Sequence, residues 1–352
     1  MSLINRRKQG LSGKVTIRTV AASAGVSVAA VSKVIRNAYG VSDEMREKVN
    51  SAISTLGYRP SRPARGLRGS TFTIGVLLIG MDNPFLPQIV TGINEELSAS
   101  DYQAMIGVGQ AQISLETSLI DLMIDHKMDG VILIAPRLPT GVISKFASQV
   151  PIVTIGHHAP EATAYDTVNA DDQKGAEIAV EALAAEGFDD IGMLTLRPIA
   201  GYKGSVVEQR EIGYRNAMTR LGLGKHIRLF EIPMQQIEGG EAARQAAIND
   251  FLRLPNRPRA VFCWSDLDAI LVLAGAKTLG IEVPGELALI GYDNSPVAAY
   301  PMLGLASIDQ AGGTLGQLAT RALLTRIAGR SEASHVKVEP HLIRRGSMLR
   351  PN

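Results

Sequence analysis

Apolar residues recur with helical spacing in two short runs near the start of the chain. The first run is Ile17, Val20, Ala21 and Ala24, and the second is Val31, Val34 and Ile35. Spacings of three and four residues place each run on one face of a helix. Gly25 permits a turn between the runs, and Ser27 can cap the second helix by accepting an amide hydrogen bond. The pattern therefore predicts two short helices joined by a tight turn.

A third helix is predicted from Ser42 onward. Ser42 can cap it, Asp43 and Glu44 suit its positive first turn, and Gly57 ends it. Its apolar face comprises Met45, Val49, Ala52, Ile53 and Leu56. Two helices across a Gly-containing turn are the unit that lays its second helix in the DNA major groove, although an ordinary helical hairpin shares this spacing. The three helices together predict a small all-α domain over residues 15–58.

From residue 72 onward, apolar runs of strand length alternate with segments of helical spacing. The strand-like runs are residues 72–78, 102–108, 130–135, 151–155, 191–196, 227–232, 260–264 and 287–292. The first helical segments lie near 84–99, 114–126 and 141–148. This alternation is typical of parallel sheets that are covered on both faces. It predicts two doubly wound lobes, with a ligand bound at the carboxyl ends of the strands in the cleft between them.

Charge divides the chain at the same place. Residues 1–70 hold 13 Lys and Arg against 3 Asp and Glu, whereas the remainder holds 23 against 31. A basic head suits a phosphate backbone, because bound Lys and Arg release its counterions. We expect residues 1–14 to be a disordered basic arm. Residues 59–71, with arginines at 59, 62, 65 and 68, are predicted to form a linker that lies close to DNA.

Composition narrows the chemistry further. Cys263 is the only cysteine, so neither a disulfide framework nor a thiolate metal site is expected. No apolar run reaches the length of a signal peptide or a membrane span, so we expect a cytoplasmic protein with no membrane partner. The sequence has no nucleophile-elbow, zinc-protease or phosphate-loop motif, so we expect no enzyme, no metal and no cofactor.

An ordered set of motifs carries a resemblance to a known family. TIRTVAASAGVSVAAVSKVI (16–35) precedes VSDEMREKVNSAISTLGYRPSRPARGLRG (41–69), TIGVLL (73–78) and DNPF (82–85). Further marks are DGVIL (129–133), VNADDQKGA (168–176), REIGYRNAM (210–218), SDLDA (265–269), VPGELALIGYDN (283–294) and ASIDQ (306–310). Over residues 15–350 the chain resembles the LacI/GalR family of bacterial transcriptional regulators.

The resemblance implies a ligand-controlled repressor that acts as a homodimer or a higher oligomer. Its fold would combine an all-α helix-turn-helix head (15–58), a hinge helix or linker (59–71) that orders on operator DNA, and an α/β body (72–352). The body would be similar to periplasmic sugar-binding proteins, with two doubly wound parallel sheets. In such bodies the chain crosses between the lobes three times. We therefore expect lobe one at 72–170 and 302–330, and lobe two at 171–301 and 331–352.

By family position, the outward face of the second helix reads base edges. Val28, Ala29 and Lys33 match these residues. Lys33 can donate to guanine O6 or N7, or touch phosphate alone, whereas the other two can only meet thymine methyls or pack. The expected backbone contacts are Thr16, Ser27, Ser32, Arg36, Ser42 and the linker residue Arg62. In the hinge, Ala64 and Leu67 match residues that enter the minor groove, where Leu67 would wedge between base pairs.

Family positions also place an effector site in the cleft. Arg210 and Asp293 match the pocket arginine and its acceptor, a pairing that suits polyols because Asp accepts hydrogen bonds from hydroxyls to which Arg can donate. The other candidates are Asp82, Asn83, Phe85, Arg137, His157, Trp264, Ser265 and Gln310. Phe85 and Trp264 would stack on the ligand or fill the protein interior. Ser265 replaces the usual Asn, and His157 has a structural alternative as a lone histidine.

The identity of the effector stays open at this point. A neutral sugar is favoured, whereas a sugar acid or sugar phosphate becomes attractive if two arginines such as Arg137 and Arg197 reach the cleft. A purine is a further alternative. The body alone would also fit a sugar-binding protein without a regulatory role, but the basic helical head argues against that function.

Overall fold

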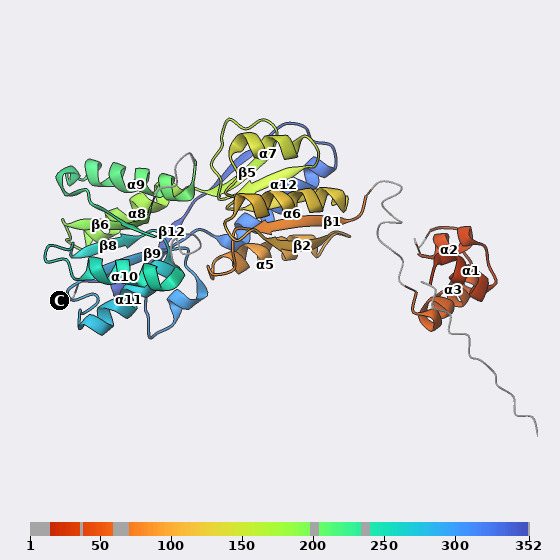
Figure 1. The fold of residues 1–352 in the computed structure, drawn as a ribbon, viewed down its shortest axis with the longest axis horizontal. Helices are drawn as coiled ribbons and strands as arrows, with labels where there is room; N and C mark the ends of the chain where they lie inside the picture. The colour runs from red at the N-terminus through yellow and green to blue at the C-terminus, as the bar shows by residue number, and fades with distance from the viewer. Residues whose placement is uncertain (1–14, 36–37, 59–69, 198–203, 234–239, 351–352) are drawn as a thin grey trace, which may run out of the picture. The chain divides into compact units, whose positions relative to one another are not determined.

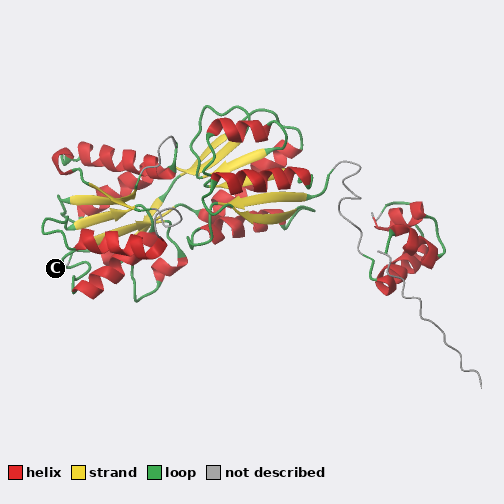
Figure 2. Ribbon diagram, in the orientation of Figure 1, coloured by secondary structure: helices red, strands yellow, loops and turns green. Residues whose placement is uncertain are grey.

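The computed structural model describes residues 15–35, 38–58, 70–197, 204–233 and 240–350. The chain divides into two compact units, Met1–Thr71 and Phe72–Asn352, which we call the head and the body (Figure 1). Figure 2 shows that the described head is helical, whereas the body combines helices with strands. Each unit is described by itself below.

The head is a three-helix domain whose helices are α1 (Ile17–Ala24), α2 (Val28–Ile35) and α3 (Asp43–Leu56). Val20, Val31 and Val49, one from each helix, are completely buried and form the centre of its core. Gly25 ends α1 in the left-handed conformation, with a φ of 66° that favours glycine. The hydroxyl of Ser27 accepts the Ala30 N–H at 3.1 Å and so caps α2. The predicted helices, turn and cap are therefore confirmed.

The body contains two six-stranded sheets. The first sheet has the order β2-β1-β3-β4-β5-β11, and the second has the order β7-β6-β8-β9-β10-β12. The strands of the first are β1 (Thr73–Leu78), β2 (Gln103–Val108), β3 (Gly130–Ile134), β4 (Ile152–Ile155), β5 (Asp166–Ala170) and β11 (His335–Val338). Those of the second are β6 (Ile191–Leu196), β7 (Leu229–Ile232), β8 (Ala260–Cys263), β9 (Ala288–Tyr292), β10 (Ala306–Asp309) and β12 (His341–Ile343). All pairs are parallel except β10 with β12, so the second sheet is mixed rather than purely parallel.

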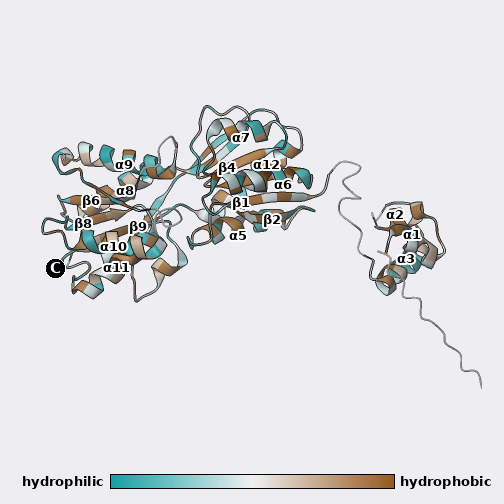
Figure 3. Ribbon diagram, viewed as in Figure 1, coloured by the Kyte–Doolittle hydropathy of each residue, from teal (hydrophilic) through white to brown (hydrophobic). Residues whose placement is uncertain are grey.

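Helices cover both faces of each sheet, as the strand–helix alternation predicts. In lobe one, α5 (Leu86–Leu97) and α12 (Gly312–Ile327) pack on one face, and α6 (Ile113–Asp125) and α7 (Thr140–Ala147) on the other. In lobe two the pairs are α8 (Asp172–Ala185) with α9 (Val206–Arg220), and α10 (Gly240–Leu252) with α11 (Asp266–Leu279). Short 3-10 turns occupy Gly224–His226, Pro296–Ala299 and Gly346–Met348. Figure 3 shows apolar residues concentrated in the strands that these helices enclose.

The lobe boundaries differ from the expectation at two places. β10 pairs with β9, so residues 306–309 belong to lobe two rather than to lobe one. β11 pairs with β5, so residues 335–338 belong to lobe one rather than to lobe two. The chain therefore crosses between lobes after β5, after β10 and after β11. Hydrophobic periodicity identifies a strand but not the strand with which it pairs, and for this reason the predicted crossings were displaced.

Glycines allow α5 and α12 to approach each other closely. A Cβ built at Gly92 of α5 would lie 2.0 Å from the carbonyl oxygen of Gly313, and a Cβ built at Gly316 of α12 would lie 2.1 Å from that of Ile89. Both neighbours are backbone atoms, which cannot rotate away as a side chain can. The contact anchors α12, the helix that follows the second crossing, to lobe one.

We predict opposite effects for two alanine substitutions in α12. Gly316→Ala should lower the urea midpoint of the body, because overpacking a close contact costs about 1–3 kcal/mol. Gly313→Ala is the matched control, since a Cβ there meets nothing within 4 Å. It should leave stability unchanged or raise it, because Ala is preferred to Gly inside a helix by about 0.5–1 kcal/mol. Equal midpoints for the two variants would contradict the close approach.

Candidate effector cavity and DNA-reading face

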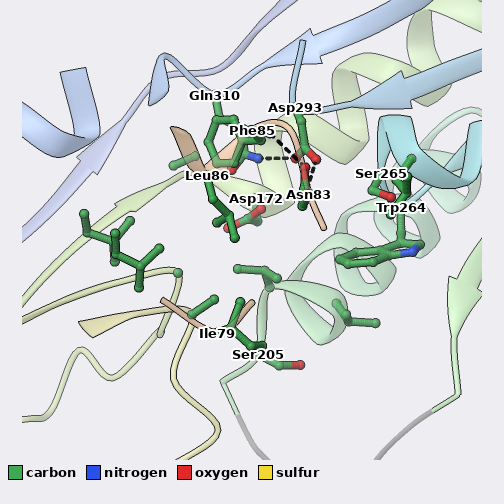
Figure 4. Close-up of a pocket in the computed structure, with 18 of the residues that line it drawn as sticks. Ile79, Asn83, Phe85, Leu86, Asp172, Ser205, Trp264, Ser265, Asp293 and Gln310 are labelled. Carbon is green, nitrogen blue, oxygen red and sulfur yellow. Dashed lines mark hydrogen bonds between the residues drawn. The ribbon is translucent and has the colours of Figure 1, made fainter. Parts of the chain in front are cut away.

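A cavity of about 140 Å³ lies between the two lobes of the body. Its walls are formed by residues at or just after the ends of β1, β3, β4, β5, β6, β8, β9 and β10, together with the starts of α8 and α9 and Arg244 of α10 (Gly240–Leu252). Figure 4 shows Asn83, Asp293 and Gln310 close together in this cavity, with Trp264 and Ser265 on a neighbouring segment. The cavity is therefore at the carboxyl ends of the strands, where the parallel topology directs a ligand.

Nine of the ten predicted effector residues line this cavity. They are Asp82, Asn83, Phe85, Arg137, Arg210, Trp264, Ser265, Asp293 and Gln310. Phe85 is also buried in the core of lobe one, so this residue both lines the cavity and packs in the hydrophobic core. The structure thus brings these side chains together, and their contact with an effector stays a prediction.

His157 is the exception, because it is not among the residues that line the cavity. Its ring lies among other side chains of lobe one, with Nε2 within hydrogen-bond distance of Thr140 Oγ1 and of Tyr165 Oη, at 3.3 and 3.1 Å. Gly156, with a φ of 70°, lines the cavity in its place. Burial lowers the pKa of His157 to about 4, so the ring remains neutral near pH 7. His157 is a structural histidine, and Arg197 is also outside the cavity lining.

Arg210 is buried and held by a carboxylate from a neighbouring helix. Its Nε donates to Asp172 Oδ1 at 2.8 Å, and its Nη1 donates to the carbonyl oxygen of Trp264. The guanidinium also stacks over the Tyr292 ring, with its carbon 3.7 Å from the ring centre. The other oxygen of Asp172 lies 2.8 Å from His158 Nε2. Arg210 is therefore fixed from several sides before any ligand arrives.

The Arg210–Asp172 pair keeps its charges despite its burial. Burial acts to raise the pKa of Asp172, but the Arg210 guanidinium and the His158 ring outweigh it, and the pKa lies below its usual value. For Arg210, burial acts to lower the pKa, and Asp172 raises it above the ordinary value. The pair is therefore ionised at neutral pH, with the two charges offsetting each other.

Asp293 joins the lobes at another point of the cavity. It accepts hydrogen bonds from Asn83 Nδ2 of lobe one at 3.0 Å and from Gln310 Nε2 at the second crossing at 2.5 Å. Its φ of 114° is unusual for a residue other than glycine, and such strained backbone is concentrated at ligand-binding sites. Burial raises the pKa of Asp293 to about 7, with Arg210 acting in the opposite direction. This carboxyl therefore changes charge within the physiological pH range.

Arg244 is a cavity residue that the sequence did not reveal. Its Nε and Nη2 each donate to Asp268, at 2.6 Å, in a bidentate pair that is almost completely buried. Ser265 donates its hydroxyl hydrogen to the same carboxylate at 2.7 Å and caps α11. Arg244 lies on a helix rather than after a strand, so no positional signal marks it. Asp172 was not predicted as a cavity residue either, because the family resemblance places Asp171 and Asp172 at a structural turn.

The outward face of α2 carries the predicted DNA-reading side chains. Val28, with 41% of its surface exposed, Ala29 and Lys33 face away from the core, and Ser32 is half-buried. The predicted phosphate contacts Thr16, Ser27 and Ser42 each cap a helix of the head and are exposed. Arg36, Arg62, Ala64 and Leu67 lie outside the described residues, so their predicted DNA contacts stay predictions.

The described residues hold no cluster of three His, Cys, Asp or Glu side chains that could bind a metal ion. No single helix in the described ranges is long and apolar enough to cross a membrane. The helices α1 and α2 have the required length and composition only when they are taken together, and the angle between them is 104°.

Fold and cavity together define a DNA-binding head joined to a two-lobed small-molecule receptor, the architecture of a ligand-responsive transcriptional regulator. Residues 16–61 match the family model "Bacterial regulatory proteins, lacI family", and residues 180–348 match "Periplasmic binding protein-like domain". The chain is 31% identical over 337 residues to the HTH-type transcriptional repressor PurR of Erwinia tasmaniensis, covering 95% of this chain and 96% of that relative. It is 32% identical over 338 residues to the ribose operon repressor of Haemophilus influenzae, covering 95% and 98%.

Solved structures show the same fold. The lac repressor dimer bound to operator and the anti-inducer ONPF has a TM-score of 0.81 at 22% identity, covering 96% of this chain and all of that one. The regulator CelR in complex with cellobiose has a TM-score of 0.68 at 26% identity, covering 95% and 99%. The chain belongs to the LacI family of bacterial transcriptional regulators.

Proposed function

We propose that the protein is a repressor that binds operator DNA as a homodimer and responds to a small, uncharged polyol bound between the lobes of its body. The observation that carries this proposal is the cavity itself, where buried charged groups of lobe two and polar groups of lobe one surround a space for a small molecule. The curated relatives quoted above are named as repressors, which supports a regulator rather than an enzyme. Such a regulator works at the chromosome, in the bacterial cytoplasm.

The charges of the cavity wall favour a neutral effector over an anionic one. The arginines that line the cavity are Arg137, Arg210 and Arg244. Arg210 is paired with Asp172, and Arg244 is paired with Asp268. These buried carboxylates offset the positive charge that a sugar acid or sugar phosphate would need. The apolar wall, which includes Phe85 and Trp264, suits the carbon face of a sugar ring, and the polar groups suit its hydroxyls. A LacI-family regulator from Enterococcus faecium is similar in fold and was solved with bound ribose.

An exposed apolar surface on lobe one supports the proposed dimer. β2 is an edge strand on which Met105 and Ile106 are half-exposed, and Ile113 and Leu122 of α6 are exposed to the same degree. Unpaired edge strands with apolar side chains promote association, and large exposed apolar patches mark interfaces. On lobe two, Met302 is 95% exposed. We propose that a second copy of the chain covers these residues.

The DNA-binding function is tested with a duplex selected from random sequences by the full-length protein. We expect a site of two inverted halves, with an affinity that falls as salt rises because Lys and Arg displace counterions. Lys33→Ala should weaken binding to this site and relax its preference at one base position, since a lost base contact costs about 1–3 kcal/mol. Lys33→Arg is the matched control, because it keeps the charge and the ability to donate to guanine.

A result in which Lys33→Ala weakens all sequences equally would restrict Lys33 to phosphate contact. If no duplex binds at low salt, with or without candidate effectors, the regulatory proposal is lost.

Effector binding should depend on pH through Asp293. A thermal-shift screen of sugars, sugar acids, sugar phosphates and nucleobases identifies the ligand, because a compound that binds the folded state raises the melting temperature. Fluorescence of Trp264, the only tryptophan, then measures affinity. Because the pKa of Asp293 is raised to about 7, its carboxylate form increases from pH 6 to pH 8, and affinity for a polyol should rise over that range.

Asp293→Asn should bind more weakly and lose this pH dependence. This variant is needed because burial also raises the pKa of Glu116 to about 7, and Glu116 Oε2 accepts the backbone N–H of the cavity residue Arg137. An unchanged pH profile in Asp293→Asn would assign the titration to another group. If only nucleobases raise the melting temperature in the screen, the proposed effector is a purine-type compound rather than a polyol.

A further inference from the structure

The start of α9 is tied to lobe one across the interface between the lobes. His157 and Ser205 form an isolated antiparallel bridge, and the His158 N–H donates to the carbonyl oxygen of Gly204 at 2.9 Å. His157 and His158 follow β4 of lobe one, whereas Gly204 and Ser205 precede α9 of lobe two. We call these four residues the clasp. In the clasp, the backbone of His157 and His158 connects the lobes.

The clasp is closely fitted around Gly204. A Cβ built at Gly204 would lie only 2.3 Å from the carbonyl oxygen of His158, and the φ of Gly204 is 75°. On its own lobe, the Gly204 N–H donates to Glu208 Oε2 at 2.7 Å, and Ser205 Oγ accepts the Glu208 N–H at 3.1 Å. These two hydrogen bonds join the first turn of α9 to the clasp.

Each lobe's part of the clasp is connected to Arg210 through a short series of contacts. Along lobe two, Arg210 stands on α9, whose first turn the clasp holds. Along lobe one, the His158 ring lies 2.8 Å from Asp172, the carboxylate that fixes Arg210 Nε through its other oxygen. Movement of the clasp therefore acts on Arg210 through its helix and through its charge partner. The contacts of Asn83 with Asp293 and of Gln88 with the Asn294 carbonyl join the lobes elsewhere.

We propose that the clasp is a positioning element that holds α9 and Arg210 over the cavity, and that the lobes part by releasing it. The inference deepens the proposed function, because it names the contact through which closing of the body would regulate the effector site. It also makes Gly204 a residue on which the closed cavity depends without touching a ligand.

Gly204→Asn tests the clasp, and Gly222→Asn is its matched control. Both glycines have a φ of 75°, a conformation that Asn tolerates better than other side chains. A Cβ at Gly222 meets nothing within 4 Å, so the two variants differ in the close approach and not in backbone strain. The reporter is Trp264, the only tryptophan, which lines the cavity.

In Gly204→Asn without any ligand, we expect a red shift of the Trp264 emission and a larger acrylamide quenching constant than in the wild-type protein. The urea midpoints should confirm that both variants are folded. Gly222→Asn should match the wild type in emission and quenching. Identical emission and quenching in the two variants would overturn the proposal. Because neither DNA nor effector is present, a failure of the proposed function would not alter this comparison.

Amide exchange in the wild-type protein gives a second test that does not depend on the folding of a variant. The His158 N–H should be protected from exchange, because it is bonded across the lobes to Gly204. Exchange of the His158 N–H at the rate of an exposed loop amide would show that the clasp is not formed in solution, and would overturn the proposal as well.

Discussion

The structure of the body depends on one buried ion pair, Arg210 with Asp172. A charge inside a protein is costly unless it is paired and its remaining hydrogen-bonding groups are satisfied. Here the guanidinium has a carboxylate, a backbone carbonyl and an aromatic face as partners, and the carboxylate has a guanidinium and an imidazole. These partners come from α8, α9, the end of β8, the end of β9 and the loop after β4. The full set of partners is complete only when all five segments are in place.

This constraint explains the character of the cavity. Because Arg210 and Arg244 each carry a matched carboxylate, the wall presents fixed hydrogen-bonding groups without a large net charge. Apolar side chains such as Phe85 and Trp264 also line the cavity, and hydrogen bonds are stronger in such a region of low dielectric constant. Asp293, whose pKa burial raises to about 7, adds a charge that varies near neutral pH. In the function that we propose, this wall would favour an uncharged ligand over an anion by electrostatics as well as by shape.

Much of the fold could be predicted from the sequence, and physical reasons explain which elements were not. The helices of the head follow from the spacing of Val20, Val31 and their neighbours, and the strong strands from their apolar runs. β5, β10, β11 and β12 were not predicted, because all four are short and polar residues such as Asp166, Ser307 and Lys337 interrupt the apolar pattern.

The residues of the cavity could also be predicted only in part. Asn83 and Asp293 could be placed at the cavity because they match family positions in loops that follow strands, and parallel strands share a carboxyl edge. Arg244 could not, because it reaches the cavity from a helix. His157 follows a strand as well, but Gly156 turns the chain and the imidazole points toward Tyr165. Position along the sequence therefore predicts which segment reaches a site, but not which side of the segment faces it.

The central claim is that occupancy of the body cavity and DNA binding by the head are energetically coupled. The most direct measurement is a pair of titrations with the effector found by thermal shift. Operator affinity is measured by fluorescence anisotropy with and without saturating effector, and effector affinity by Trp264 fluorescence with and without saturating operator. Linkage requires that each ligand change the affinity of the other by the same factor, and we predict a factor that differs clearly from one. An operator affinity that stays the same when the cavity is filled would contradict the account.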